Sequence, residues 1–154
     1  MSQLLYAVQF RGRATGDDRG KGVVRTTAFA PSCTVTTLIG SKGIYGAIEP
    51  APGERATFES EVIAEGAIRP RGTATVSYGM TGHCLCLTLL GALDLDNGPL
   101  MAAQSALIWK VERGEGQFAG ARGLITSNLI RGDAGEVTDN QLGVIFLAPP
   151  GGDE

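Results

Sequence analysis

Apolar and polar residues alternate along several short stretches of this chain, which is the pattern of half-buried β-strands. Leu4 to Arg13 alternates loosely, and Thr57 to Ile68 alternates clearly, with Phe58, Ser60 and Val62 on one face. No window of 11 or more residues has a helical period, so we expect little helix. Further strand-like stretches are Val23 to Phe29, Cys33 to Ile39, Gly72 to Tyr78, His83 to Leu93, Leu100 to Val111, Leu124 to Arg131 and Val137 to Leu147.

Glycine-rich and polar turns separate these stretches. Ala14 to Gly20, Gly79 to Gly82 and Asp96 to Gly98 are typical turns between strands. Gly40 to Arg55 holds four glycines and two prolines, which predicts a long loop or an irregular edge. About eight strands joined by short turns fit an antiparallel sandwich or barrel, and we favour an all-β, eight-stranded antiparallel barrel.

The run from Glu112 to Gly123 lies between two of the predicted strands. Its glycines bracket one aromatic residue, Phe118. Glycine reaches positive φ without steric cost, so the backbone is expected to turn tightly here while the ring of Phe118 fills the core. The strand-to-strand context excludes a phosphate-binding loop, which needs a following helix.

Composition predicts a single domain. The chain has 154 residues, of which 43% are hydrophobic and 19% charged. This argues against disorder and predicts one barrel domain over residues 1–148 with a flexible tail at 149–154. The net charge of −3 gives no basis for binding nucleic acid or an anionic membrane.

The few residues with special chemistry exclude several classes of protein. The chain has three cysteines and one histidine, too few for a zinc or multi-histidine metal site, and Cys84 and Cys86 are expected to pack as small apolar residues. The N-terminus lacks the features of a signal peptide, so we expect a cytoplasmic protein with reduced thiols. Neither a Gly-x-Ser-x-Gly elbow nor a Walker loop is present, and we expect no cofactor.

A resemblance sharpens the expected fold. The pattern Gly-x-Gly-x-Phe-x-Gly-x-x-Gly, from Gly114 to Gly123, follows a hydrophobic strand and precedes another. Between about Leu107 and Ile130 the chain resembles the allene oxide cyclase and dirigent-like barrel superfamily. The resemblance implies an eight-stranded barrel, often dimeric or trimeric, around an apolar cavity that shapes a substrate. The motif is scaffold in that family, so it transfers no catalytic residue.

Three residues are candidates for catalysis. His83, the single histidine, lies at a predicted barrel rim and is either an acid or base or a surface turn residue. Tyr78 shares a strand face with apolar residues and is either a donor to a substrate oxygen or structural. Arg122, if it faces inward, needs a carboxylate partner, either a substrate or Glu112 or Glu115 across the hairpin.

Four residues are candidates for substrate binding. Trp109 is either a cavity wall or a core residue, and Tyr6 resembles Tyr78 in its setting. Asn128 shares the strand face of Arg122. Glu61 shares a face with Glu59, where the two are either paired carboxylates or solvated side chains.

The leading hypothesis is a cofactor-free isomerase or cyclase acting on an apolar, oxygenated small molecule. The alternatives are a non-catalytic barrel that binds or carries such a molecule, and a structural oligomerisation module. Leu85 to Leu90 and Leu142 to Leu147 are apolar on both faces. A barrel whose outer surface faces water would have polar residues on its outer faces. We therefore expect these apolar outer faces to be covered, either in a homo-oligomer or by a loop.

Overall fold

The computed structural model describes residues 2–16, 22–64, 69–80, 82–94 and 104–149. Within these residues the chain forms ten strands and one turn of 3₁₀ helix, η1 (Gly116–Phe118). The strands are β1 (Ser2–Gly16), β2 (Val23–Ala30), β3 (Cys33–Gly40), β4 (Gly43–Pro50), β5 (Ala56–Ile63), β6 (Arg71–Tyr78), β7 (His83–Asp94), β8 (Gln104–Glu115), β9 (Arg122–Arg131) and β10 (Glu136–Leu147).

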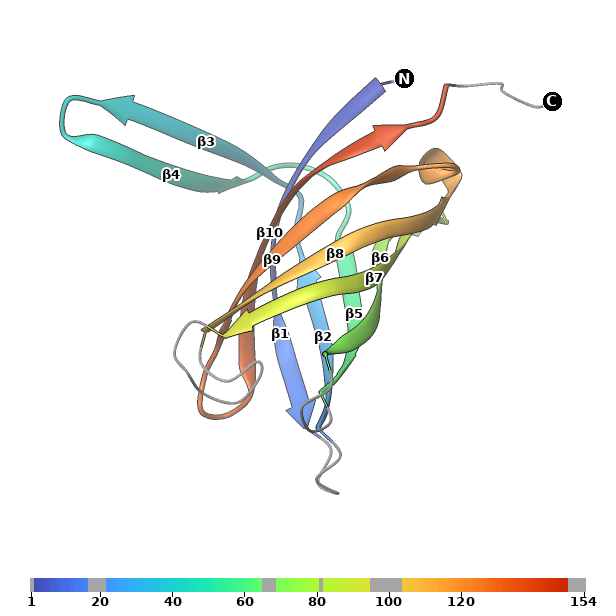
Figure 1. The fold of residues 1–154 in the computed structure, drawn as a ribbon. Coiled ribbons are helices and arrows are strands. Elements are labelled where there is room, and N and C mark those ends of the chain that lie inside the picture. Colours follow the sequence, from blue (N-terminus) through green and yellow to red (C-terminus); the bar gives the residue numbers. More distant parts are fainter. Residues whose placement is uncertain (1, 17–21, 65–68, 81, 95–103, 150–154) are drawn as a thin grey trace.

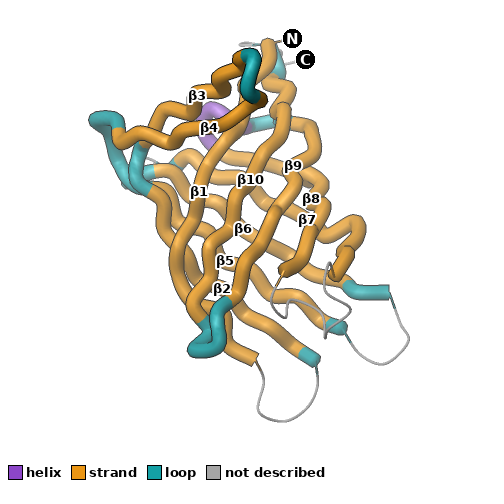
Figure 2. The backbone as a smooth tube through the Cα atoms, turned by 90° about the vertical axis from the view of Figure 1, so that its left-hand side faces the viewer, coloured by secondary structure: helices purple, strands orange, loops and turns teal. Residues whose placement is uncertain are grey.

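Eight of the strands close into an antiparallel barrel, which confirms the predicted fold class (Figure 1). Around the barrel the order is β1, β10, β9, β8, β7, β6, β5 and β2, and β2 pairs with β1 to close it. All of these pairings join strands that follow one another along the chain except two: β1 with β10, and β2 with β5, which β3 and β4 separate. Figure 2 shows the sheet continuing from β1 through β10 to β9 on one side of the molecule.

Alternation decides which side chains fill the barrel. Phe58, Ser60 and Val62 point inward as predicted, and the intervening residues of β5 point outward. Phe10 and Trp109 join them from β1 and β8. The ring centroids of Phe10 and Phe58 are 5.5 Å apart, and Phe58 meets Trp109 edge-on at 6.2 Å. An eight-stranded barrel is just wide enough for such packing, so aromatic side chains occupy its middle section.

The glycine-rich hairpin between β8 and β9 anchors one end of the barrel. Phe118 in η1 is only 3% exposed, as predicted for a core plug, and its ring lies 5.2 Å from that of Tyr78. A Cβ added to Gly114 would lie 2.5 Å from the Cβ of Phe118. The residue at 114 must therefore lack a side chain for the plug to sit where it does.

The prediction of a long loop or an irregular edge over Gly40 to Arg55 is wrong. Residues 43–50 form β4, which pairs with β3 in a two-stranded hairpin that belongs to no barrel sheet. We call β3, β4 and their turn the arm; it projects away from the barrel in Figure 1. Gly40 and Gly43 flank the turn, Gly46 pairs with Thr37 within the ladder, and Pro50 ends the strand. The β-branched residues between them are free to pair.

The apolar outer faces expected along two strands are present. Leu90, Leu142 and Phe146 project outward and are exposed, so no described segment covers them. Other expectations fall on residues outside the described ranges. They are the turn at Asp96 to Gly98, most of the turn at Ala14 to Gly20, residues 65–68 and 100–103 of two predicted strands, and the tail except for residue 149.

Candidate functional site: a cleft at the barrel mouth

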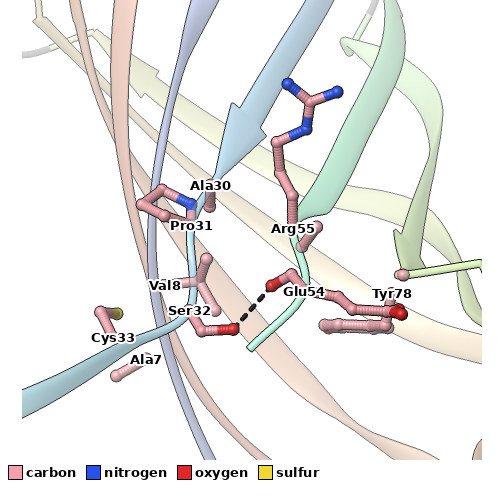
Figure 3. Close-up of a pocket in the computed structure, with 11 residues that line it drawn as sticks. Ala7, Val8, Ala30, Pro31, Ser32, Cys33, Glu54, Arg55 and Tyr78 are labelled. Atoms are coloured by element: carbon pink, nitrogen blue, oxygen red, sulfur yellow. Dashed lines mark hydrogen bonds between the residues drawn. The ribbon is translucent and has the colours of Figure 1, made fainter. Parts of the chain in front are cut away.

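A pocket of about 370 Å³ opens at the end of the barrel from which the arm leaves (Figure 3). Its walls come from β1, the link between β2 and β3, the segment before β5, and the end of β6. In Figure 3, Val8 and Pro31 lie on one side, and Glu54, Arg55 and Tyr78 lie on the other. Most of the lining side chains are apolar, and a volume of this size suits a small molecule.

The link from barrel to arm shapes one wall of this cleft. Ala30 is the last residue of β2 to pair with β5, and Pro31 follows it without an N–H for the ladder. The Ser32 hydroxyl donates a hydrogen bond to the Glu54 carbonyl oxygen at 2.6 Å. The Ser32 carbonyl accepts one from the Ala51 N–H at 3.0 Å. Together these bonds fix the two crossings between barrel and arm.

A close contact between Glu54 and Gly79 shapes the opposite wall. Gly79 has a φ of 62°, and the Glu54 side chain packs over the space where a Cβ would be. The Glu54 carboxylate accepts a hydrogen bond from the Met80 N–H at 3.1 Å, and the Gly79 N–H donates to the Arg55 carbonyl at 3.0 Å. These contacts hold the end of β6 against the start of β5.

Arg55 supplies a positive charge at the cleft. Its guanidinium carbon lies 4.5 Å above the centre of the Phe29 ring. In the part of the chain that the structure describes, no carboxylate lies within ion-pair distance of Arg55. An arginine stacked on an aromatic ring keeps its donors free for a planar acid or another oxygen-bearing group.

Tyr78 connects the cleft to the barrel interior. Its side chain lines the cleft, while its hydroxyl is buried beside the hydroxyl of Tyr6. Burial raises the pKa of Tyr78 well above its usual value. Burial also raises the pKa of Tyr6, and the neighbouring Tyr78 and Asp139 raise it further. Both phenols therefore stay protonated near neutral pH and act as donors.

Behind Tyr6 a chain of hydrogen bonds leads into the barrel. The Tyr6 hydroxyl donates to Gln141 Oε1 at 2.9 Å, and Gln141 Nε2 donates to Asp139 Oδ2 at 2.9 Å. Ser127 also donates to Asp139 Oδ2. Burial raises the pKa of Asp139, and the hydrogen bonds from Gln141 and Ser127 only partly oppose this effect. The network therefore favours a neutral acid in the interior.

Some buried polar side-chain atoms have no hydrogen bond of normal geometry. Among the described residues, four strands each contribute one such atom. They are Thr26 Oγ1 on β2, Tyr78 OH on β6, Trp109 Nε1 on β8 and Asp139 Oδ1 on β10. Native interiors leave few polar groups unpaired, and each one calls for an explanation.

The structure brings together two of the predicted site residues, Tyr6 and Tyr78. Trp109 is fully buried between apolar neighbours, which is the core position rather than the cavity wall. His83 lies at the same end as the cleft but does not line it. Its Nδ1 accepts a hydrogen bond from the Gln117 N–H at 3.0 Å, so it helps to hold η1 in place.

The other three predicted residues lie on the outer surface. Arg122 points outward and donates to the Ala121 carbonyl at 3.2 Å. Its proposed role required an inward-facing side chain, so the structure does not support that role. Asn128 shares that outer face and donates to the Asn140 carbonyl at 3.1 Å. Glu61 is half-buried on the outer face and pairs with Arg25 at 2.9 Å. It is therefore a surface carboxylate rather than half of a carboxylate pair with Glu59.

Sequence reasoning missed the polar residues of the interior, although a signal was present. Asp139 and Gln141 share a strand face with Val137 and Ile145, and Ser127 lies between Ile125 and Leu129 on its own face. A period of two therefore places all three polar side chains inside. The cleft residue Arg55 carried no such signal, because the segment around it was expected to be a loop.

Other site types find no support in the described residues. Within them, no three His, Cys, Asp or Glu side chains are grouped to hold a metal ion. None of their helical segments is long and apolar enough to span a membrane. No protein-family model, curated protein or solved structure matches this chain.

Proposed function

We propose that this barrel binds a small molecule with an apolar body and an oxygen-bearing group in the cleft at its mouth. The observation that carries the proposal is a mostly apolar cleft of about 370 Å³ with an unpaired arginine, Arg55, at its edge. Apolar walls supply affinity, and a few polar groups set orientation. The packed middle of the barrel limits how deep a ligand reaches, so the mouth is the site.

A carboxylate is the oxygen-bearing group that fits best. The guanidinium of Arg55 offers paired donors that match the two oxygens of an acid. The nearby Glu54 carboxylate is held by the Met80 N–H and packs over Gly79. The ligand class is thus an amphipathic acid, such as a fatty acid or an oxygenated derivative of one.

Binding is tested by calorimetry with a panel of fatty acids, their hydroxy and epoxy derivatives, and the matching neutral alcohols. We expect acids to bind more tightly than alcohols. Arg55→Gln should weaken acid binding by roughly 10-fold or more and leave the alcohols unchanged. The matched control is Arg71→Gln, which removes the same charge at the far end of β6. Equal losses in both variants, or no binding by any member of the panel, would contradict the proposal.

Isomerisation or cyclisation of the bound molecule is the second candidate function. It is favoured by the donor network behind the cleft, where Tyr78 and Tyr6 keep their protons and Asp139 favours its neutral form. Such donors polarise a carbonyl or epoxide oxygen and stabilise the charge that develops on it. We assign this role to Tyr78, whose side chain lines the cleft.

Tyr78→Phe separates the two functions, because it keeps the ring that lines the cleft and removes the hydroxyl. An enzyme should bind its substrate nearly as before but lose most of its turnover, which product analysis by mass spectrometry measures. A binding protein should return its ligand unchanged with either side chain. Recovery of unaltered ligand from the wild-type protein across the whole panel would exclude the enzymatic alternative for those compounds.

A further inference from the structure

The arm is the least supported element of the described fold. Its strands are eight residues each and pair only with each other. An isolated two-stranded hairpin is at best marginally stable in water. The arm also exposes large apolar side chains, with Ile39 82% and Ile44 67% accessible. A protein surface rarely leaves such a patch uncovered unless a partner docks there.

One face of the arm is mostly apolar, with Thr37 as its polar residue. Residues paired across an antiparallel ladder project from the same face, and the pairs Val35 with Ile48 and Ile39 with Ile44 share one of them. The opposite face is mixed: it carries Thr34, Thr36 and Glu49, and also the exposed Leu38 and Tyr45. We call the first of these the apolar arm face; it consists of Cys33, Val35, Thr37, Ile39, Ile44, Gly46, Ile48 and Pro50.

The barrel carries a second uncovered apolar surface. Leu5, Leu124 and Leu142 project outward from β1, β9 and β10 and are 78%, 52% and 51% exposed. Val144 pairs with both Leu5 and Leu124, and Ile108 continues the surface onto β8. We call these five residues the apolar wall. None of them is charged, so the wall suits a neutral partner.

The arm and the wall border the same side of the molecule. In Figures 1 and 2 the arm leaves the barrel above the side formed by β1, β10 and β9. A groove of about 290 Å³ separates the base of the apolar arm face from the barrel. Ile48 and Pro50 line it on the arm side, and Gln9, Arg11 and Phe29 line it on the barrel side. The arm and the wall thus form a corner with two uncovered apolar sides.

We propose that the arm of one chain docks on the apolar wall of a second copy of this chain, reciprocally, in a two-fold dimer. This goes beyond the small-molecule binding proposed above and does not depend on it. In a two-fold dimer each chain contributes the same two surfaces, so each corner is filled by the partner's arm. The two surfaces match because both are uncharged and apolar.

The area of the two surfaces supports reciprocal docking. Each arm is about 27 Å long and about 10 Å wide from strand rise and spacing, so one arm face covers roughly 270 Å². A single docked arm buries too little for a stable interface. In a reciprocal dimer each of the two arms covers an equal area of the other chain's wall, so four such surfaces are buried, roughly 1,100 Å² in total. A specific interface needs about 1,000 Å².

A membrane is the other surface that an apolar arm could enter, and the charges disfavour it. The arm carries one lysine, Lys42, and one glutamate, Glu49, and the chain has a net charge of −3. Peripheral anchors rely on several cations to approach anionic lipid. A second copy of the chain needs no such attraction.

The first test measures the mass of the full chain by light scattering at micromolar concentrations. We expect a dimer for the wild type and a monomer for Ile39→Lys/Ile44→Lys, with the dissociation constant raised at least roughly 100-fold. The matched control, Thr34→Lys/Thr36→Lys, adds the same charges to the other arm face and should stay dimeric. Fluorescence of the buried Trp109 reports that the barrel stays folded in each variant.

The second test locates the docking site by disulfide formation. Ile44→Cys and Leu142→Cys are placed in separate chains that carry Ser at positions 33, 84 and 86. The two chains are co-refolded and oxidised, and a mixed disulfide should form between them. The control partner is Glu59→Cys on the far side of the barrel, which should not cross-link.

Several outcomes would overturn the proposal. They are a wild-type mass other than that of a dimer, a double-lysine variant that remains dimeric, and cross-linking to position 59 as efficient as to position 142. A monomer that co-sediments with phosphatidylglycerol vesicles would also overturn it, and would assign the arm to a membrane instead.

Discussion

Gln141 donates a hydrogen bond from its side-chain amide to Oδ2 of Asp139 across 2.9 Å, and both side chains are completely buried. The amide oxygen of the same Gln141 accepts from Tyr6, so one residue joins a phenol at the mouth to an acid in the interior. A buried carboxyl with one unpartnered oxygen is costly when ionised. The network therefore has consequences for stability that do not depend on any ligand.

Asp139 should make the protein less stable as pH rises. Its pKa in the fold is raised above the ordinary value of 3.8, mainly by burial. Between 3.8 and the raised pKa the folded state holds a proton that the unfolded state has lost, so stability falls with rising pH, by up to about 1.4 kcal/mol per pH unit. Below that window the contribution is fully present. Above the raised pKa it is lost.

Asp139→Asn isolates this effect from the other carboxyl groups. The amide oxygen takes the place of Oδ2 and still accepts from Ser127 and Gln141, but the group does not titrate. Urea unfolding at a series of pH values measures the difference between wild type and variant. The difference should grow in favour of the variant as pH rises through the window. A difference that does not change with pH would mean that Asp139 titrates normally.

The barrel itself could be predicted from the sequence, because its cause is local. Alternation in β5 and β8 determines which residues face inward, and short glycine turns leave antiparallel pairing as the simple connection. The sequence pattern did not predict the second strand of the arm. Glycine and proline counts over residues 40–55 suggested a loop or an irregular edge, whereas Gly40 and Gly43 flank the turn, Pro50 ends the strand and the pairing tolerates Gly46 within it.

The candidate site was harder to predict, because it depends on how distant segments meet. Tyr6 and Tyr78 were found, since each shares a strand face with apolar residues. Arg55 joins the cleft only because the arm leaves and re-enters the barrel at one point, which fixes the segment beside Phe29. No periodic pattern of apolar and polar residues in the sequence indicates that these two segments contact each other. Arg122 and Asn128 were plausible only if their face pointed inward, and strand register decides that.

Glu61→Gln should change stability very little. The Arg25 to Glu61 pair lies on the outer wall with both side chains partly exposed, so solvent screens it. We expect a loss of less than about 1 kcal/mol in the free energy of unfolding. The dependence on salt should also fall, since the ion pair is gone. A loss of several kcal/mol in the free energy of unfolding would show that Glu61 makes a stabilising contact other than its pair with Arg25.

Tyr6→Phe should cost about 1 to 3 kcal/mol, because it leaves the buried Gln141 amide oxygen without a donor. Chemical denaturation measures the loss. Tyr45→Phe is the matched control: it removes the same hydroxyl from an exposed ring on the arm and should be nearly neutral. If both variants lose the same amount, the Tyr6 hydroxyl makes no special contribution.

Phe118→Ala should destabilise the fold by roughly 3 to 5 kcal/mol, since it removes a large buried ring and leaves a cavity beneath the β8 to β9 hairpin. The change also removes the ring that supports Tyr78 at 5.2 Å. The floor of the cleft should therefore loosen, and ligand affinity should fall together with stability. Gln117→Ala tests the same turn with an exposed side chain and keeps the backbone N–H that bonds His83, so it should change neither quantity. Urea unfolding and calorimetry on the two variants measure both effects. A Phe118→Ala protein with wild-type stability would mean that the ring is not the plug that the hairpin is built around.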